Sequence, residues 1–125
     1  MKNLQLSLKK QWFEMTKEGI KTEDYREINE YWFKRLVYNW SDVVLGCGYL
    51  HLTEENLKYI IEKRLFGFKD FETNTMTLGY PKSGDTDRIL KLEHKGVEIR
   101  TGNPEWGAEP DKIYFVIMHG AIIQE

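Results

Sequence analysis

Three long segments in the second half of the chain most constrain its fold. FETNTMTLGY (71–80), RILKLEHKGVEIR (88–100) and KIYFVIMHGAIIQ (112–124) are rich in β-branched and aromatic residues. The turn-forming clusters PKSGDTD and TGNPEWGAEPD separate these segments. Such a succession of strands and turns predicts an antiparallel, barrel-like β-sheet.

The first residues predict one more strand followed directly by a helix. Leucines alternate with polar residues at positions 4, 6 and 8, the period of a half-buried strand. We expect Ser7 to cap a helix that runs from Lys9 to about Glu18. Gly19 then stands where the C-terminal end of a helix favours a residue that tolerates positive φ.

The middle of the chain predicts two further helices. The segment EINEYWFKRLVYNW (27–40) is interpreted as a short helix, and Val43–Leu45 as a short strand. Thr53 is a suitable N-cap for a helix over EENLKYIIEKRLF (54–66). Because helices mostly precede strands, we expect an α+β fold.

Length and charge limit the classes of protein that the chain can represent. A chain of 125 residues has the size of one domain, and its 41% of hydrophobic residues can fill one core. Its formal net charge is −2, from 18 Lys and Arg against 20 Asp and Glu. This balance argues against a protein that coats duplex nucleic acid through a basic face, so nucleic-acid affinity would require a local pocket.

The sequence predicts a cytoplasmic protein. Cys47 is the single cysteine, which rules out an intramolecular disulfide and fits a reducing compartment. The first residues, MKNLQLSLKKQWF, contain no apolar stretch of signal-peptide length, and no apolar run reaches the length of a membrane span. We therefore expect no membrane partner.

The segment Gly19–Arg26, GIKTEDYR, concentrates the reactive side chains of the chain. If it is extended, its side chains alternate between two faces: Lys21, Glu23 and Tyr25 on one, and Thr22, Asp24 and Arg26 on the other. Lys21 could serve as a point-charge donor or, if desolvated, as a base or nucleophile. Arg26 could bind a carboxylate or phosphate, or pair with Asp24 to hold the strand. The alternative is a solvated charged strand with ordinary surface ion pairs.

A second candidate site lies in the turn Arg100–Ala108, RTGNPEWGA. Asn103 and Pro104 begin a turn, and Trp106 stands at its centre. A Trp106 side chain beside a cleft could stack on a base, with Glu105 accepting hydrogen bonds from a base edge. Alternatively, Trp106 packs against one end of the barrel.

A looser aromatic and basic set comprises Trp32, Arg35, Trp40 and Tyr49. Aromatic rings interleaved with arginine suit single-stranded RNA or an unstacked base. At helical spacing, Trp32 and Leu36 equally fit a hydrophobic core.

The sequence predicts no metal and no cofactor. Its histidines, His51, His94 and His119, are scattered, and Cys47 stands alone. Neither the spacing of a zinc site nor the motifs of a phosphate-binding loop, a dinucleotide fold or a nucleophile elbow are present.

The pattern LxLxxxWFxxxxxGxKTEDYRE, from Leu6 to Glu27, resembles the ASCH domain of the PUA-like superfamily. The later stretch GNPEWGAEPDKIYFVIMHGAII is similar to the closing region of a bacterial and phage subgroup. This resemblance implies one domain over residues 1–125, a PUA-like antiparallel β-barrel with short flanking helices, and roles linked to RNA. It also implies that a G-x-K segment and a downstream arginine, here Gly19, Lys21 and Arg26, line a central pocket.

One branch of the family hydrolyses an acetylated cytidine with a Lys, a Thr and a Glu. Lys21 matches the Lys, whereas Asp24 occupies the position of the Thr. Glu93 and Glu98 are the candidates for the Glu.

Three functions follow from these features. The first is binding of RNA or of a modified nucleoside or nucleotide, with seven candidate contacts: Lys21, Glu23, Asp24, Tyr25, Arg26, Glu105 and Trp106. The second is a small amidohydrolase acting on an N-acylated cytidine-like base, with Lys21 and Glu93 as catalytic candidates. The third is a protein-interaction domain with a vestigial pocket. The sequence leaves the oligomeric state open.

Overall fold

The computed structural model describes residues 2–48, 52–81 and 85–124. Their contacts divide the chain into two compact units. The first unit runs to Glu27 and resumes at Asp70, and the second is Ile28–Lys69. The described residues form four α-helices and one five-stranded sheet, so the predicted α+β class is confirmed. A single domain over residues 1–125 stays a prediction beside this division.

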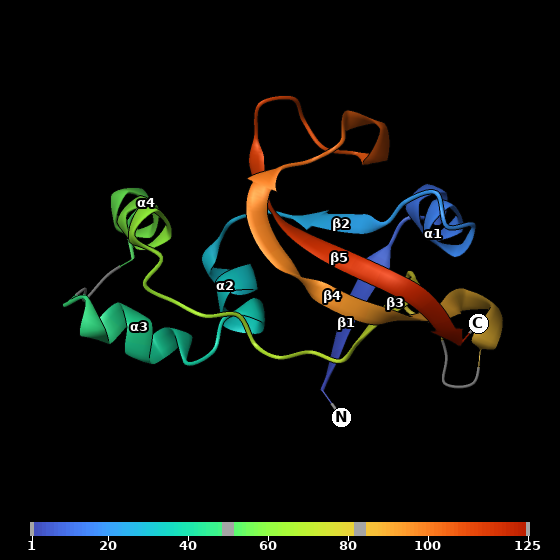
Figure 1. The fold of residues 1–125 in the computed structure, drawn as a ribbon, viewed down its shortest axis with the longest axis horizontal. Helices are drawn as coiled ribbons and strands as arrows, with labels where there is room; N and C mark the ends of the chain where they lie inside the picture. Colours follow the sequence, from blue (N-terminus) through green and yellow to red (C-terminus); the bar gives the residue numbers. More distant parts are fainter. Residues whose placement is uncertain (1, 49–51, 82–84, 125) are drawn as a thin grey trace. The chain divides into compact units, whose positions relative to one another are not determined.

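The sheet belongs to the first unit and is a strongly curled half-barrel (Figure 1). Its strands are β1 (Asn3–Leu8), β2 (Glu23–Arg26), β3 (Thr73–Leu78), β4 (Ile89–Thr101) and β5 (Ile113–Gln124). They lie in the order β1-β3-β4-β5-β2, which makes β1 and β2 the two edges. Three neighbouring pairs are antiparallel, as predicted, and β1 runs parallel to β3. The long connection between β1 and β3 permits this parallel pairing, which a tight turn could not.

A bulged region explains the curl of the two longest strands. The register of β4 against β5 shifts at several steps between Lys91 and Gly96. Bulges of this kind bend a strand and increase its twist. Gly96 has a φ of 120°, a backbone conformation that side chains rarely adopt. Figure 1 shows β4 and β5 bending together beyond this region.

The predicted N-terminal strand and helix are confirmed, with one correction. The leucines of β1 are buried, and α1 (Lys10–Lys17) buries Phe13 and Thr16. Ser7 does not cap α1, because it lies within β1 and its hydroxyl donates to the Gly79 carbonyl at 3.1 Å. Gly19 follows the helix with a φ of 77°, as predicted.

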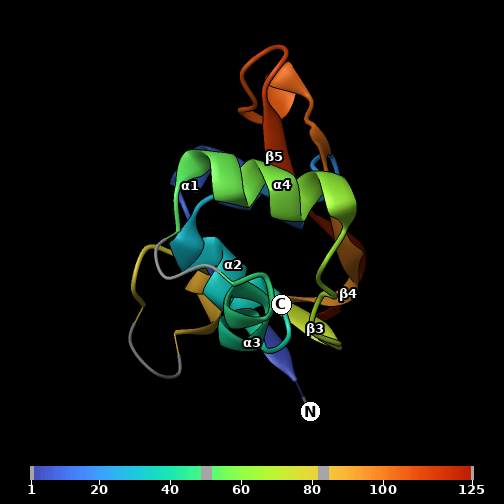
Figure 2. The same cartoon turned by 90° about the vertical axis from the view of Figure 1, so that its left-hand side faces the viewer.

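The second unit contains α2 (Glu30–Leu36), α3 (Trp40–Gly46) and α4 (Glu54–Lys63). In Figure 2, α4 lies across the view and α3 is seen along its axis. Thr53 caps α4 as predicted, since its side chain accepts from the Asn56 N–H at 3.1 Å. None of the helices in the described ranges is long and apolar enough to cross a membrane.

The predicted strand at Val43–Leu45 is wrong, because these residues belong to α3. The ring of Trp40, the first residue of α3, stacks on Phe33 of α2 at 4.3 Å between centroids. This buried stacking holds the first residue of α3 in place, although the β-branched Val43 and Val44 favour a strand. Tertiary packing therefore outweighs the local preference of these two residues.

Candidate functional site

The turn between α1 and β2 places Lys21 inside the protein. The backbone N–H groups of Ile20 and Lys21 both donate to the Met15 carbonyl, at 3.0 and 3.1 Å. This reversal, together with the positive φ of Gly19, directs the chain from the helix end into the edge strand. Lys21 is consequently buried, with 3% of its surface exposed.

The Lys21 ammonium group lies among polar atoms and aromatic rings. Its Nζ donates to the Glu23 carbonyl at 2.5 Å and lies 3.4 Å from Asp24 Oδ1. The rings of Tyr25 and Trp12 have their centroids 5.4 and 6.0 Å from Nζ. Burial lowers the pKa of Lys21, and the charge of Asp24 offsets part of that effect.

Asp24 joins Lys21 to the framework of the sheet. Asp24 is 4% exposed, and its carboxylate accepts from Arg26 Nε at 2.6 Å. Arg26 Nη2 donates in turn to the Ser7 carbonyl at 2.9 Å. The pairing of Arg26 with Asp24, one of the two predicted roles of Arg26, is therefore present in the structure.

Glu23 and Tyr25 make their contacts on the other face of β2. Arg100 Nη2 of β4 donates to Glu23 Oε2 at 2.6 Å, and the Tyr25 hydroxyl donates to Glu23 Oε1 at 2.7 Å. Burial favours a higher pKa for Glu23, but the hydrogen bonds from Arg100 and Tyr25 lower it overall. The predicted alternation holds within β2, whereas Lys21 precedes the strand and turns toward Asp24.

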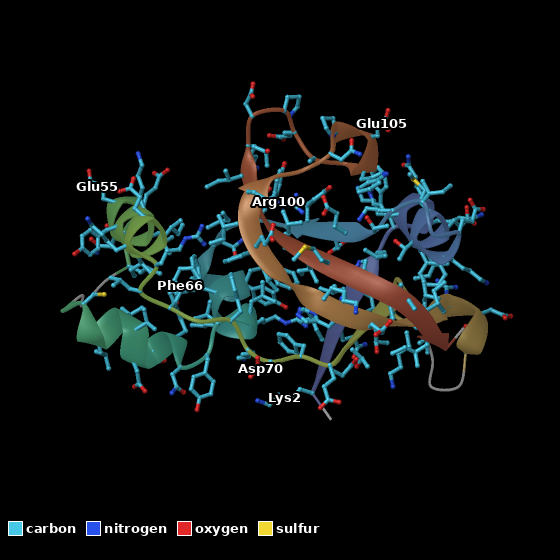
Figure 3. All side chains as sticks on the ribbon, viewed as in Figure 1. Lys2, Glu55, Phe66, Asp70, Arg100 and Glu105 are labelled. Atoms are coloured by element: carbon cyan, nitrogen blue, oxygen red, sulfur yellow. The ribbon has the colours of Figure 1, made fainter. Side chains whose placement is uncertain are left out.

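The loop between β4 and β5 is attached to β2 through Tyr25. The Tyr25 hydroxyl accepts from the Asn103 N–H at 2.8 Å, and Asn103 Oδ1 accepts from the Glu105 N–H at 2.9 Å. A short 3-10 turn, η2 (Pro104–Trp106), follows and ends at Gly107, which has a φ of 99°. Figure 3 labels Arg100 on β4 and Glu105 on this loop.

These elements line a partly open pocket of about 250 Å³ in the first unit, referred to below as the Lys21 pocket. Its lining residues are Trp12, Lys21, Asp24, Tyr25, Glu27, Trp106, Gly107, Glu109 and Tyr114. Four predicted site residues therefore meet at one place: Lys21, Asp24, Tyr25 and Trp106. Trp106 is half-buried against the pocket.

The remaining predicted site residues do not line the Lys21 pocket. Glu23 and Arg26 are engaged in the contacts above, and Glu105 is exposed on the loop. The Glu93 carboxylate accepts from the Ala121 N–H at 3.0 Å and lies 3.6 Å from Lys95 Nζ. Glu98 is bound by Arg100 Nε at 2.7 Å. The pocket acid nearest to Lys21 is thus Asp24, not Glu93 or Glu98.

Sequence analysis missed several pocket residues. Trp12 lies on the predicted N-terminal helix, but nothing in the sequence placed it beside Lys21. Tyr114 contributes an aromatic wall, and its hydroxyl accepts from the Glu109 N–H at 2.9 Å. Only the pairing of β5 with β2 brings Tyr114 near Tyr25, at 5.8 Å between ring centroids.

The lining of the Lys21 pocket is acidic. Its carboxylates belong to Asp24, Glu27 and Glu109, against the single cation Lys21 among the described lining residues. Lys112 partly compensates, because its Nζ lies 2.8 Å from a Glu27 oxygen and 3.8 Å from a Glu109 oxygen.

The aromatic and basic set of the second unit divides into two parts. Trp40 is buried and belongs to the core of that unit. The Arg35 guanidinium lies 4.7 Å from the centroid of the Trp32 ring. Tyr49 and His51 lie outside the described residues.

Within the described ranges, no group of three or more His, Cys, Asp or Glu side chains could hold a metal ion. Comparisons with protein-family models, curated proteins and solved structures gave no match. The proposals below therefore rest on the geometry of the Lys21 pocket and on the motif residues at positions 19, 21 and 26.

Proposed function

We propose that the chain is an ASCH-type domain that binds a nucleoside, or the unstacked base of an RNA, in the Lys21 pocket. One observation carries the proposal: aromatic walls and a buried donor–acceptor pair, Lys21 and Asp24, line the same pocket.

The aromatic walls suit a flat ligand. Trp12, Tyr25, Trp106 and Tyr114 all line the pocket. Stacking of a base on an aromatic side chain is worth about 1–3 kcal/mol in single-strand binders and tolerates any base. Proteins that recognise RNA sequence commonly stack unpaired bases in this way.

The buried pair suits the polar edge of a base. An ammonium group has three N–H donors, and Lys21 directs two of them to the Glu23 carbonyl and Asp24. A carboxylate offers about four lone-pair positions, so Asp24 can accept from a ligand while it holds Lys21 and Arg26. A base edge that carries a donor beside an acceptor complements this arrangement.

Size and charge favour the base over the phosphate as the buried part. The pocket volume of about 250 Å³ lies just below the roughly 300–1,000 Å³ of sites for drug-sized ligands. The three carboxylates of the lining would repel a phosphate. We infer that sugar and phosphate stay outside.

Titration with nucleosides tests the proposal. We expect cytidine, uridine, adenosine or guanosine to change the heat of binding or the tryptophan fluorescence of the wild-type protein. Lys21→Met should weaken that binding at least about tenfold, since it removes a charged donor without shortening the side chain. Lys95→Met is the matched control, because Lys95 is exposed on β4 and forms an ion pair with Glu93, away from the Lys21 pocket. Unchanged affinity in Lys21→Met would contradict the proposal.

Hydrolysis of an N-acylated base is the second candidate function. Burial lowers the pKa of Lys21, although the charge of Asp24 offsets part of this effect, and a lowered pKa favours the neutral amine that a base or nucleophile requires. In this reaction water adds to the acetyl carbon of N4-acetylcytidine, the C–N bond breaks, and acetate and cytidine leave. Asp24 takes the place that the resemblance assigns to a Thr.

Chromatography of N4-acetylcytidine after incubation distinguishes the two functions. Turnover by the wild type that is lost in Lys21→Met supports the hydrolase. Binding without turnover supports the binding module. If neither depends on Lys21, a protein-interaction domain with a vestigial pocket becomes the better explanation.

A further inference from the structure

The mouth of the Lys21 pocket carries two carboxylates that the base-binding proposal does not use. Glu27 and Glu109 both line the pocket, and their side chains are 56% and 73% exposed. Lys21 and Asp24 line the same pocket but are buried. The lining thus changes from buried polar groups to exposed carboxylates, and these carboxylates lie where a ligand enters.

Lys112 brings the two carboxylates together. Its Nζ lies 2.8 Å from Glu27 Oε1 and 3.8 Å from Glu109 Oε2. Glu27 directly follows β2, whereas Glu109 belongs to the loop between β4 and β5. An exposed ion pair contributes little to stability. Its consequence here is geometric, because one ammonium group holds two acceptors from distant segments at the same opening.

Tyr114 connects this opening to the aromatic wall of the pocket. Its hydroxyl accepts from the Glu109 N–H at 2.9 Å, and its ring centroid lies 5.2 Å from Lys112 Nζ. The residue that offers a stacking surface to a base therefore also positions Glu109 and Lys112. Because the buried Lys21 and Asp24 occupy the inner end, a base in the pocket would carry its sugar toward the mouth.

The hydroxyls of a ribose complement the acceptors at the mouth. An ionised carboxylate can only accept, and ribose offers adjacent donors at its 2′ and 3′ positions. A carboxylate has about four lone-pair positions, so Glu27 can accept from a hydroxyl while it holds Lys112. Hydrogen bonds from a hydroxyl to a carboxylate are roughly twice as strong as those between neutral groups. Dinucleotide-binding folds bind the ribose 2′-hydroxyl through an Asp or Glu in the same way.

We propose that Glu27 and Glu109 are specificity-determining residues that accept hydrogen bonds from the ribose hydroxyls of the bound nucleoside. The inference rests on the proposed nucleoside binding and names the sugar: the pocket selects ribonucleosides over 2′-deoxyribonucleosides. The 2′-hydroxyl is the group by which a protein distinguishes RNA from DNA at a given site. A 2′-deoxynucleoside keeps the base contacts with Lys21 and Asp24 but loses a donor at the mouth.

Calorimetric titration of the wild-type protein tests the inference without any substitution. Each ribonucleoside is compared with the 2′-deoxynucleoside of the same base. We expect the ribonucleoside to bind about tenfold more tightly, since the two differ by one hydrogen bond to a charged group. Equal affinities would overturn the inference and leave nucleoside binding in the Lys21 pocket intact. The absence of binding by every nucleoside would overturn both.

The double variant Glu27→Gln/Glu109→Gln tests the assignment to these two residues. It keeps the size of both side chains but removes their charge, so we expect the preference for ribose to fall below about threefold. The affinity for 2′-deoxynucleosides should stay within about twofold of wild type, whereas general damage to the pocket would weaken both ligands equally. Glu14→Gln is the matched control, because Glu14 is exposed and pairs with Lys10 at 4.0 Å outside the pocket. An undiminished preference for ribose in the double variant would refute the assignment.

The 3′-deoxynucleosides separate two sources of the ligand. Inside an RNA chain the 3′-oxygen is esterified, so only the 2′-hydroxyl remains as a donor. Weaker binding of the 3′-deoxynucleoside, together with weaker binding of the 2′-deoxynucleoside, supports the inference for a free nucleoside or the 3′ end of an RNA. Loss of affinity with the 2′-deoxynucleoside alone supports it for a nucleotide within the RNA chain.

Discussion

Arg26 joins Ser7 across the open side of the curled sheet. Its Nη2 donates to the Ser7 carbonyl at 2.9 Å, and its Nε binds Asp24 at 2.6 Å. Ser7 and Arg26 lie on β1 and β2, the two edge strands, which share no backbone ladder. One side chain thus connects the edges of the half-barrel and at the same time holds the acceptor of the Lys21 pocket.

Replacing Arg26 should destabilise the protein. Arg26→Met leaves the Ser7 carbonyl without this donor and leaves Asp24 with Lys21 as its remaining cation in the contacts above. Loss of one partner of a buried ion pair costs roughly 3–5 kcal/mol, and because Lys21 remains we expect about 2–3 kcal/mol. Urea denaturation measures the free energy of unfolding. Lys34→Met, which breaks an exposed pair with Glu30, should cost less than about 0.5 kcal/mol. Similar losses in both variants would argue against the bridging role.

Stability should fall in mild acid because of His119. Burial lowers the pKa of His119 from its ordinary value of 6.5 to about 4. Between these pH values the unfolded chain binds a proton at His119 that the folded chain does not. The free energy of unfolding therefore decreases as pH falls from about 6.5 to about 4, by up to about 3 kcal/mol. Burial also lowers the pKa of His94, which acts in the same direction.

The variant His119→Gln isolates this contribution. Urea denaturation at several pH values should give a clearly smaller slope for His119→Gln than for wild type across this window. Equal slopes would show that His119 titrates normally in the folded protein.

Gly102 should not tolerate a side chain. A Cβ atom there would lie 2.7 Å from ring carbons of Tyr25 and 2.8 Å from the Ala108 Cβ, inside van der Waals contact. We expect Gly102→Ala to cost about 1–3 kcal/mol and to weaken nucleoside binding by displacing the loop that carries Trp106. Gly46→Ala in α3 meets nothing within 4 Å and should be neutral or stabilise the protein by up to about 1 kcal/mol. Thermal denaturation of the two variants distinguishes these outcomes.

Tyr25→Phe should loosen the loop between β4 and β5. The substitution leaves the Asn103 N–H without its acceptor, while Glu23 keeps Arg100. We expect a loss of about 1–2 kcal/mol and faster hydrogen exchange at Asn103. Tyr38→Phe serves as the control, because Tyr38 is 60% exposed and should leave both quantities unchanged. Unaltered exchange at Asn103 in Tyr25→Phe would show that the hydroxyl does not hold the loop.

Hydrophobic periodicity, β-branched and aromatic composition, turn clusters and helix capping together predicted most of the secondary structure. The alternating leucines of β1, the capped helix after Thr53 and the three C-terminal strands all appear where the sequence indicates. These elements follow from local preferences and from a buried face, which the sequence displays directly. The prediction of a strand at Val43–Leu45 was wrong, because the stacking of Trp40 on Phe33 outweighs the preference of β-branched residues for strands.

The sequence by itself determined which residues could do chemistry near Lys21, but only the tertiary structure decided which of them share a pocket. Lys21, Asp24 and Tyr25 are close along the chain, and simple alternation predicted their faces apart from that of Lys21. Trp12 and Tyr114 come from other elements: the reversal after α1 lies between Trp12 and Lys21, and the pairing of β5 with β2 brings Tyr114 to the same pocket. The buried state of Lys21 was equally undetermined, because burial depends on the reversal after α1 and on the rings that cover it. Local interactions act over a few residues, whereas desolvation and pocket geometry depend on contacts between distant segments, and these form only on folding.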